Sequence, residues 1–218
     1  MMEENNLSSA DKTYQRLEEM IVLTELKPGV MYTEKELAEL LDVGRTPVRE
    51  ALQRLSLEGL VNIIQRRGVQ ISEVDAAVQL QLLEVRRVIQ NLAAATAAQR
   101  ASAEDRQAML AFAEELETRS GENIPSRAQA LLDVSEAFDL VMNASHNPYV
   151  DKALGIVRGM SRRFWIYHMK RRDYTPAAGH YAEMLRAVAG GDAENATTAS
   201  NALIDYLVEF AHGTVDWE

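Results

Sequence analysis

The apolar positions in the first third of the chain change from helical spacing to short extended runs. Steps of three and four residues predict helices over residues 11–26, 33–41 and 44–57. Two short apolar runs, 60–64 and 69–71, follow and are separated by a polar turn, which predicts a β-hairpin. Helix, tight turn, helix and hairpin in this order is the layout of a winged helix-turn-helix.

Local signals fix both ends of the second predicted helix. Thr33 is a good N-cap, and Glu36 three residues later completes a capping box. Asp42 lies at the turn toward the next helix, where left-handed backbone is needed and where Asp is tolerated more readily than most residues. We expect this helix to bury its three leucines, Leu37, Leu40 and Leu41.

After residue 73, helical spacing continues to the end of the chain. Six amphipathic stretches follow one another, separated by breaks rich in glycine, proline or asparagine, and no strand pattern appears. The apolar residues that mark them span residues 78–92, 109–116, 131–141, 154–167, 184–188 and 199–210. The whole pattern predicts a mainly α fold: a flexible N-terminus at 1–10, a winged helix-turn-helix at 11–73 and an all-α bundle of about six helices at 74–218.

Composition and charge narrow the function classes. The 218-residue chain has no cysteine, which excludes a disulfide framework, a thiolate metal site and a cysteine nucleophile. Its longest uncharged stretch, residues 88–99, is too short to span a membrane, and its acidic start is unlike a secretory signal. We therefore expect a soluble, cytoplasmic protein without membrane contact. The net charge of −10 argues against nucleic acid, yet residues 43–68 carry five arginines against two glutamates, and screening makes such local clusters decisive.

The third predicted helix opens with a sequence suited to base contacts. Gly44 is an acceptable N-cap, and Pro47 is tolerated only in a first turn, so the helix begins near Arg45. Arg45 and Arg49 then lie four residues apart on one face, with Thr46 beside them. The N-terminal end of a recognition helix meets base edges, and arginine can donate two hydrogen bonds to guanine.

Two arginines on a helix are, taken alone, equally compatible with a plain solvated surface. The tight turn before the helix, the proline that fixes its start and the basic hairpin tip Arg66-Arg67-Gly68 favour a DNA-contacting face instead.

These segments resemble the GntR family of bacterial transcription regulators over about residues 12–72. The matching residues are Leu26-Lys27-Pro28-Gly29, Glu36-Leu37-Ala38, Arg45-Thr46-Pro47-Val48-Arg49-Glu50-Ala51-Leu52, Leu55, Glu58-Gly59-Leu60-Val61 and Arg66-Arg67-Gly68. The resemblance implies a set of DNA contacts: Lys35, Arg45, Thr46 and Arg49, together with a wing at Arg66, Arg67 and Gly68 whose backbone reaches the minor groove. One departure is Gly44, where the family usually has serine, so a side-chain cap and a phosphate contact are lost.

The all-helical second domain resembles the FadR subgroup, whose effector-binding bundle is called FCD. The supporting residues are Glu84-Val85-Arg86, Ala144-Ser145-His146-Asn147-Pro148 and Gly191-Asp192. This resemblance implies a homodimer, and a pocket in the bundle for a small metabolite that is often a carboxylic acid.

Many members of this subgroup hold a divalent metal with one Asp and three His, and here the sequence departs from the pattern. The segment that would supply the first His falls on residues 135–139, and neither plausible alignment places a His there. Tyr181 takes the second His position, with His180 adjacent, and Leu203 takes the last. We therefore expect no metal and no cofactor, although a one-residue shift would bring His180 into the pocket.

Polar residues close to apolar stripes remain as candidates to bind the effector. They are Arg86, Asp139, Asn143, Arg162, His180, Tyr181 and Asn201. A guanidinium inside a pocket matches a carboxylate with two parallel hydrogen bonds. A surface ion pair with a nearby acid explains Arg86 equally well at this point.

The leading hypothesis is therefore a ligand-responsive transcription regulator, more specifically a repressor, that binds a pseudo-palindromic operator as a homodimer. An enzyme housed in the bundle is the second hypothesis, but no catalytic triad, Gly-rich phosphate loop or paired-carboxylate pattern stands out. The third is an architectural DNA-binding protein that has no effector.

Overall fold

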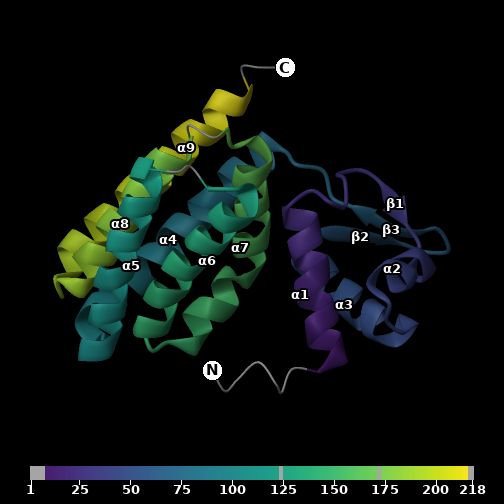
Figure 1. Cartoon of the computed structure of the whole chain (residues 1–218), viewed down its shortest axis with the longest axis horizontal. Coiled ribbons are helices and arrows are strands. Elements are labelled where there is room, and N and C mark those ends of the chain that lie inside the picture. Colours follow the sequence, from purple (N-terminus) through teal and green to yellow (C-terminus); the bar gives the residue numbers. More distant parts are fainter. Residues whose placement is uncertain (1–7, 123–124, 171–172, 216–218) are drawn as a thin grey trace. The chain divides into compact units, whose positions relative to one another are not determined.

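A computed structural model describes residues 8–122, 125–170 and 173–215 (Figure 1). The chain divides into two compact units, Met1–Val74 and Asp75–Glu218. The first combines helices with a small three-stranded sheet, and the second is helical wherever it has regular structure in its described part. The expected fold class, a mainly α chain with a winged helix-turn-helix and a helical C-terminal domain, is confirmed. None of the described helices is long and apolar enough to cross a membrane.

The first unit packs its helices on an antiparallel sheet. Its elements are α1 (Ser9–Val22), β1 (Met31–Tyr32), α2 (Glu34–Leu41), α3 (Arg45–Leu57), β2 (Val61–Ile64) and β3 (Gly68–Ile71). The strand order is β1-β3-β2, so the predicted hairpin β2–β3 gains a short third strand from the chain before α2. Fully buried leucines and isoleucines from α1, α3 and the strands form the core, including Leu17, Ile21, Leu52, Leu55 and Ile71.

The ends of α2 follow their local signals, whereas the ends of α1 differ from expectation. Thr33 and Glu36 form both bonds of the capping box, and Asp42 adopts left-handed backbone at φ 53°, as expected. Helix α1 begins at Ser9 because the Ser8 side chain accepts from the Asp11 amide, and it ends at Val22, four residues before the expected end. Residues 1–7 of the expected flexible stretch lie outside the described residues. Of the three leucines expected to be buried in α2, Leu37 is fully buried, Leu41 is partly buried and Leu40 is 56% exposed, because α2 packs mainly through the face of Leu37.

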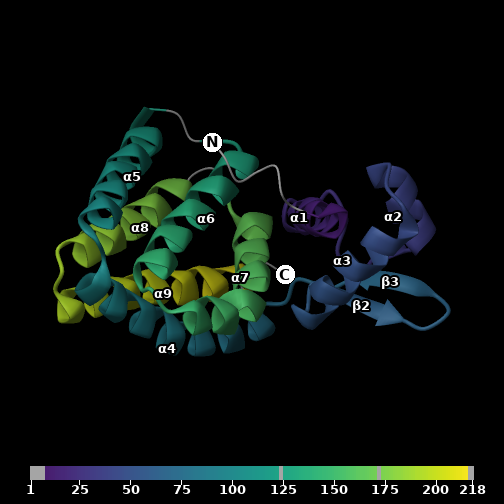
Figure 2. The ribbon, with the colours of Figure 1, turned by 90° about the horizontal axis from the view of Figure 1, so that it is seen from below.

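Six helices make up the described part of the second unit, in agreement with the sequence. They are α4 (Ala76–Arg100), α5 (Ala103–Glu122), α6 (Arg127–Ala144), α7 (Pro148–His168), α8 (Tyr174–Ala189) and α9 (Ala193–Val215). Figure 2 shows α4 and α9 running side by side, and Figure 1 shows α5 lying along α8. Helix α4 also contacts α6, α7 and α8, so it is the central helix of this unit.

Helix α4 is oriented in a way that its apolar spacing does not predict. Val85 and Leu92 of the apolar pattern are exposed, as is Val88, at 72%. Gln79, Arg86 and Gln90 instead face the interior. The small residues Ala93, Ala94, Ala97 and Ala98 continue this buried face toward the C-terminal end. The central helix therefore buries a polar and small-residue face and leaves an apolar face in solvent.

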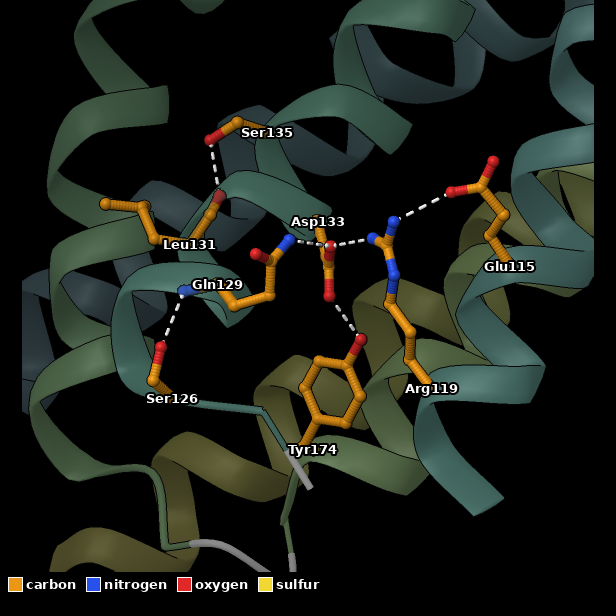
Figure 3. A network of polar contacts seen from close by, with 8 residues as sticks. All are labelled: Glu115, Arg119, Ser126, Gln129, Leu131, Asp133, Ser135 and Tyr174. Carbon is orange, nitrogen blue, oxygen red and sulfur yellow. Dashed lines mark hydrogen bonds and ion pairs between the residues drawn. The ribbon is translucent and has the colours of Figure 1, made fainter. Parts of the chain in front are cut away.

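A second buried polar cluster joins α5, α6 and α8 (Figure 3). Asp133 is 1% exposed and accepts hydrogen bonds from Arg119 Nη1, Tyr174 Oη and Gln129 Nε2, the last at 2.9 Å. Arg119 also reaches Glu115, at 2.7 Å, on the surface of its own helix. Each carboxylate oxygen of Asp133 has at least one donor, so neither oxygen is buried without a hydrogen bond.

Candidate DNA-reading face and effector pocket

The N-terminal end of α3 presents the predicted recognition residues to solvent. Gly44 is the N-cap and makes no side-chain capping bond, as its lack of a side chain requires. Arg45 is the first helical residue, and Arg45, Thr46 and Arg49 are all exposed, while Val48 between them is fully buried. The helix is thus anchored through Val48, and the arginine side of its first turns is accessible to a ligand.

Arg49 has a partner that sequence reasoning missed. Its Nε and Nη2 donate to the two carboxylate oxygens of Glu34, at 3.1 and 2.7 Å. Glu34 is the first residue of α2, so the bond joins the two helices on either side of the turn. This hydrogen bond and the positive charges of Arg49 and Arg45 lower the pKa of Glu34 below its usual value. Residues 34 and 49 lie on different helices, so no spacing rule within one helix predicts the pair from the sequence.

The remaining predicted DNA contacts are accessible in the first unit. Lys35 is exposed on α2, and its nearest acidic partner is Glu39, at 3.5 Å. Arg66 and Arg67 are exposed at the tip of the β2–β3 hairpin, and Arg66 adopts φ 63° there.

Gly68 is required by the fold itself. It adopts φ 122°, and a Cβ at this position would collide with the carbonyl oxygen of Tyr32 in β1. Position 68 therefore requires glycine because β3 lies so close to β1. This requirement holds whether or not the wing also approaches DNA.

A small arginine-lined cavity lies in the second unit. It has a volume of about 10 Å³, enough for roughly one water molecule. Its lining residues are Arg86, Val134, Phe138, Leu154, Arg158, Arg162 and Tyr181. Three of the predicted effector residues, Arg86, Arg162 and Tyr181, therefore meet at one place.

Arg86 is the most deeply buried charge at this cavity, with 5% of its surface exposed. Its three nitrogens donate to Gln90 Oε1 at 2.8 Å, Ser161 Oγ at 3.1 Å and Tyr181 Oη at 3.1 Å. All three partners are neutral, so among the described residues this guanidinium is hydrogen-bonded but has no bonded counter-ion. Burying a cation in this way is costly unless an anion compensates it.

Two further arginines complete the cavity wall. Arg158, which sequence reasoning missed, pairs with Asp139 at 2.6 Å, and Arg162 donates to Ser135 Oγ at 2.6 Å. The guanidinium groups of Arg86 and Arg158 lie 5.5 and 5.2 Å from the centre of the Phe138 ring. Arg158 and Arg162 are four residues apart on α7, and this spacing was the available signal for a shared face.

Four predicted effector residues do not line the cavity. Asn143 is exposed on α6, and Asn201 of α9 accepts hydrogen bonds from Arg87 and Asn91 of α4. His180 packs its ring against Tyr206, at 5.0 Å between ring centres, one helical position away from Tyr181. Asp139 is bound to Arg158 and reaches the cavity only through it. For these residues closeness to an apolar stripe did not fix the direction of the side chain.

The described residues contain no group of three or more His, Asp or Glu side chains placed to hold a metal ion. At the positions aligned with family ligands, the Tyr181 hydroxyl accepts a hydrogen bond from Arg86, and Leu203 is fully buried and apolar. The residues described at this place do not fit the donor set that a divalent metal requires.

Comparison with known proteins agrees with both units. Residues 9–71 match the family model described as bacterial regulatory proteins, gntR family, and residues 81–206 match the FCD domain. The chain is 34% identical over 157 residues to the Nta operon transcriptional regulator of Aminobacter aminovorans, covering 70% of this chain and 72% of that protein.

Two further similarities cover very different shares of the chain. An uncharacterized HTH-type transcriptional regulator from an unstable DNA locus of Streptomyces ambofaciens is 40% identical over 77 residues, covering 35% of this chain and about a third (33%) of that protein. The solved structure of E. coli McbR/YncC has the same fold, with a TM-score of 0.81 at 19% identity over 96% of this chain and 99% of that one. The chain therefore belongs to the gntR family of bacterial regulatory proteins, in the FadR subgroup with an FCD domain, and is a DNA-binding transcriptional regulator.

Proposed function

We propose that this regulator is a ligand-responsive repressor that acts in the bacterial cytoplasm as a homodimer. Two copies of α3 read the halves of a pseudo-palindromic operator, about 34–36 Å apart for half-sites one helical turn apart. The DNA contacts come from the predicted set, Lys35, Arg45, Thr46, Arg49, Arg66, Arg67 and Gly68. A small organic acid bound in the second unit changes the affinity for the operator.

The observation that carries the ligand response is the buried guanidinium of Arg86. It has only neutral hydrogen-bonding partners among the described residues and lies beside Arg158 and Arg162 at the same cavity. A carboxylate is the complementary ligand, because it accepts two parallel bonds from one guanidinium and neutralises its charge. Since the cavity holds roughly one water, an acid has to displace side chains to enter, which gives it unequal affinity for two arrangements of the bundle.

The direct test is a thermal-shift screen of mono-, di- and tricarboxylic acids, repeated with a chelator. We expect at least one acid to raise the melting temperature and to change operator affinity in a gel-shift titration. Because the cavity is lined by arginines and lacks a metal-ligand set, the shift is expected to be the same in EDTA. A shift that disappears in EDTA would show instead that a metal holds the acid.

One observation favours the alternative of an architectural DNA-binding protein without effector. The cavity is very small as it stands, about 10 Å³. If no acid shifts the melting temperature or operator affinity while the protein still bends or bridges duplexes, this alternative replaces the ligand-responsive one.

The proposed homodimer has a candidate surface on α4. Val78, Val85, Val88 and Leu92 are exposed and follow one another at steps of seven, three and four residues, so they lie on one face of the helix. An exposed apolar face of this length on the central helix fits pairing with the same face of a second copy.

Val88→Glu is expected to weaken the homodimer by about 30-fold or more, because it places a charge in the middle of this apolar face. Sedimentation equilibrium or light scattering at several concentrations would measure the change, and operator affinity is expected to fall with it. The matched control is Leu110→Glu on α5, which changes an exposed apolar residue outside the α4 face. Equal dimer stability in the two variants would place the interface elsewhere.

A further inference from the structure

Glu34 holds the recognition arginine Arg49 by one edge of its guanidinium. The two hydrogen bonds run from Nε and Nη2 to the two carboxylate oxygens, at 3.1 and 2.7 Å. Two parallel bonds of this kind fix the plane of the guanidinium as well as its position. Arg49 is otherwise accessible, with 62% of its side chain exposed.

The edge that Glu34 occupies is not the edge that arginine needs for an end-on contact with guanine. With Nε and the inner N–H of Nη2 bound, the outer N–H of Nη2 and the parallel outer N–H of Nη1 are not used by Glu34. These outer groups form the pair that can donate to guanine O6 and N7 in the major groove. The Glu34 contact is therefore compatible with base reading and restricts the directions from which Arg49 can do it.

Charge gives the same contact a second effect. The pKa of Glu34 is lowered, chiefly by the hydrogen bond from Arg49, so the carboxylate is ionised near neutral pH. An ionised carboxylate beside Arg49 offsets part of its attraction for phosphate, which is the sequence-independent component of DNA binding. An exposed ion pair of this type adds little to folding stability, so a role in recognition does not depend on a role in folding.

We propose that Glu34 is a specificity-determining positioning residue, which presents the outer edge of Arg49 to a guanine and lowers its attraction for phosphate. This inference rests on the proposed role of Arg49 in base reading. It adds to the predicted DNA contacts an acidic residue that touches no base and acts through the arginine.

The test compares Glu34→Gln with Glu39→Gln in the full-length protein. Both variants remove one negative charge from α2, but the ion pair of Glu39 is with Lys35 on the same helix, whereas Glu34 bonds to Arg49 on α3, so Glu39→Gln is a matched control for charge. The probes are a duplex selected by the wild-type protein from a random pool, the same duplex with each guanine replaced in turn by 7-deazaguanine, and an unrelated duplex.

For Glu34→Gln we expect the preference for the selected over the unrelated duplex to fall by about 5- to 30-fold. Binding to the unrelated duplex is expected to stay equal or become tighter, and the 7-deazaguanine that weakens wild-type binding most should no longer do so. Glu39→Gln is expected to keep both the preference and the guanine dependence. Circular dichroism melting curves of both variants check that folding is unchanged.

Three outcomes would overturn the inference, and they are distinguishable. A wild-type protein without any sequence preference would remove the proposed function on which the inference rests. A wild-type preference that Glu34→Gln retains within about twofold would leave that function intact and exclude the role of Glu34. Equal tightening of Glu34→Gln on both duplexes would show that Glu34 only blocks Arg49.

Discussion

Replacing Asp133 by alanine is expected to lower the free energy of unfolding of the second unit by about 3–5 kcal/mol. Asp133 is buried and accepts hydrogen bonds from Arg119, Tyr174 and Gln129 (Figure 3). These three donors lie on α5, α8 and α6. Removal of the Asp133 carboxylate leaves a guanidinium without its buried counter-ion and a phenol and an amide without their acceptor. Each of these losses adds to the cost because the groups cannot all turn to water.

Urea denaturation followed by tryptophan fluorescence measures this change, because Trp165 is buried on α7 of the second unit and the first unit has no tryptophan. The matched control is Glu115→Ala, which removes the exposed carboxylate on the same arginine, and a loss of no more than about 1 kcal/mol is expected there. Tyr174→Phe should fall between the two, at about 1–3 kcal/mol. A similar small loss in all three variants would show that the buried carboxylate is not what joins these helices.

The protonation state of Tyr174 supports the expected ranking of these three variants by loss of stability. Burial, the hydrogen bond to Asp133 and the charge of Asp133 raise the pKa of Tyr174, so its hydroxyl stays protonated and remains a donor at neutral and mildly alkaline pH. Tyr174 therefore does not lose its proton near neutral pH. The difference between the wild type and Tyr174→Phe should accordingly be constant from about pH 6 to 9.

What the sequence could predict was decided by local geometry. Pro47 and Gly44 fixed the start of α3 because proline lacks an amide hydrogen and glycine lacks a side chain, and both effects act within one helical turn. Asp42 and the Thr33 capping box were predictable for the same reason. The positions of Arg45 and Arg49 follow directly from that start.

What the sequence could not predict depended on contacts between distant residues. Periodicity found α4 but did not show which face is buried, because Arg86 and Gln90 are accommodated by partners on α7, α8 and α9. Asp133 looked like any acidic residue on an amphipathic helix until Arg119 and Tyr174 were placed beside it. Likewise, Glu34 gains its contact with Arg49 only when α2 and α3 pack.

The burial of Arg86 leads to an expectation that runs against the usual effect of core substitutions. Arg86→Met is expected to raise the free energy of unfolding by about 1–2 kcal/mol in the absence of ligand. Methionine fills much of the same volume and removes the penalty of burying a charge whose bonded partners are neutral. Replacing buried charged groups by apolar residues raises the free energy of unfolding by about 1–4 kcal/mol in other proteins. We expect a value at the lower end of this range because Gln90 Oε1 loses its hydrogen-bond donor.

The same substitution is expected to weaken binding of the acid effector by about 2–5 kcal/mol, since the carboxylate would be desolvated without its main cation. Urea denaturation measures the first effect, and titration of the acid from the thermal-shift screen measures the second. Arg87→Met is the matched control, because Arg87 is the next residue on α4 but pairs at the surface with Asp205 at 2.6 Å. It is expected to change neither quantity by more than about 1 kcal/mol.

Opposite signs for stability and ligand affinity in Arg86→Met would mean that the second unit keeps an unfavourable buried charge because its ligand needs it. Such a trade-off is expected at a binding site and not at a structural ion pair, where removing the arginine weakens the fold. A clear loss of stability in Arg86→Met would therefore make Arg86 a structural residue and, with it, would remove the main argument for an acidic effector. A gain in stability with an unchanged response to the acid would move the binding site to Arg158 and Arg162, which line the same cavity.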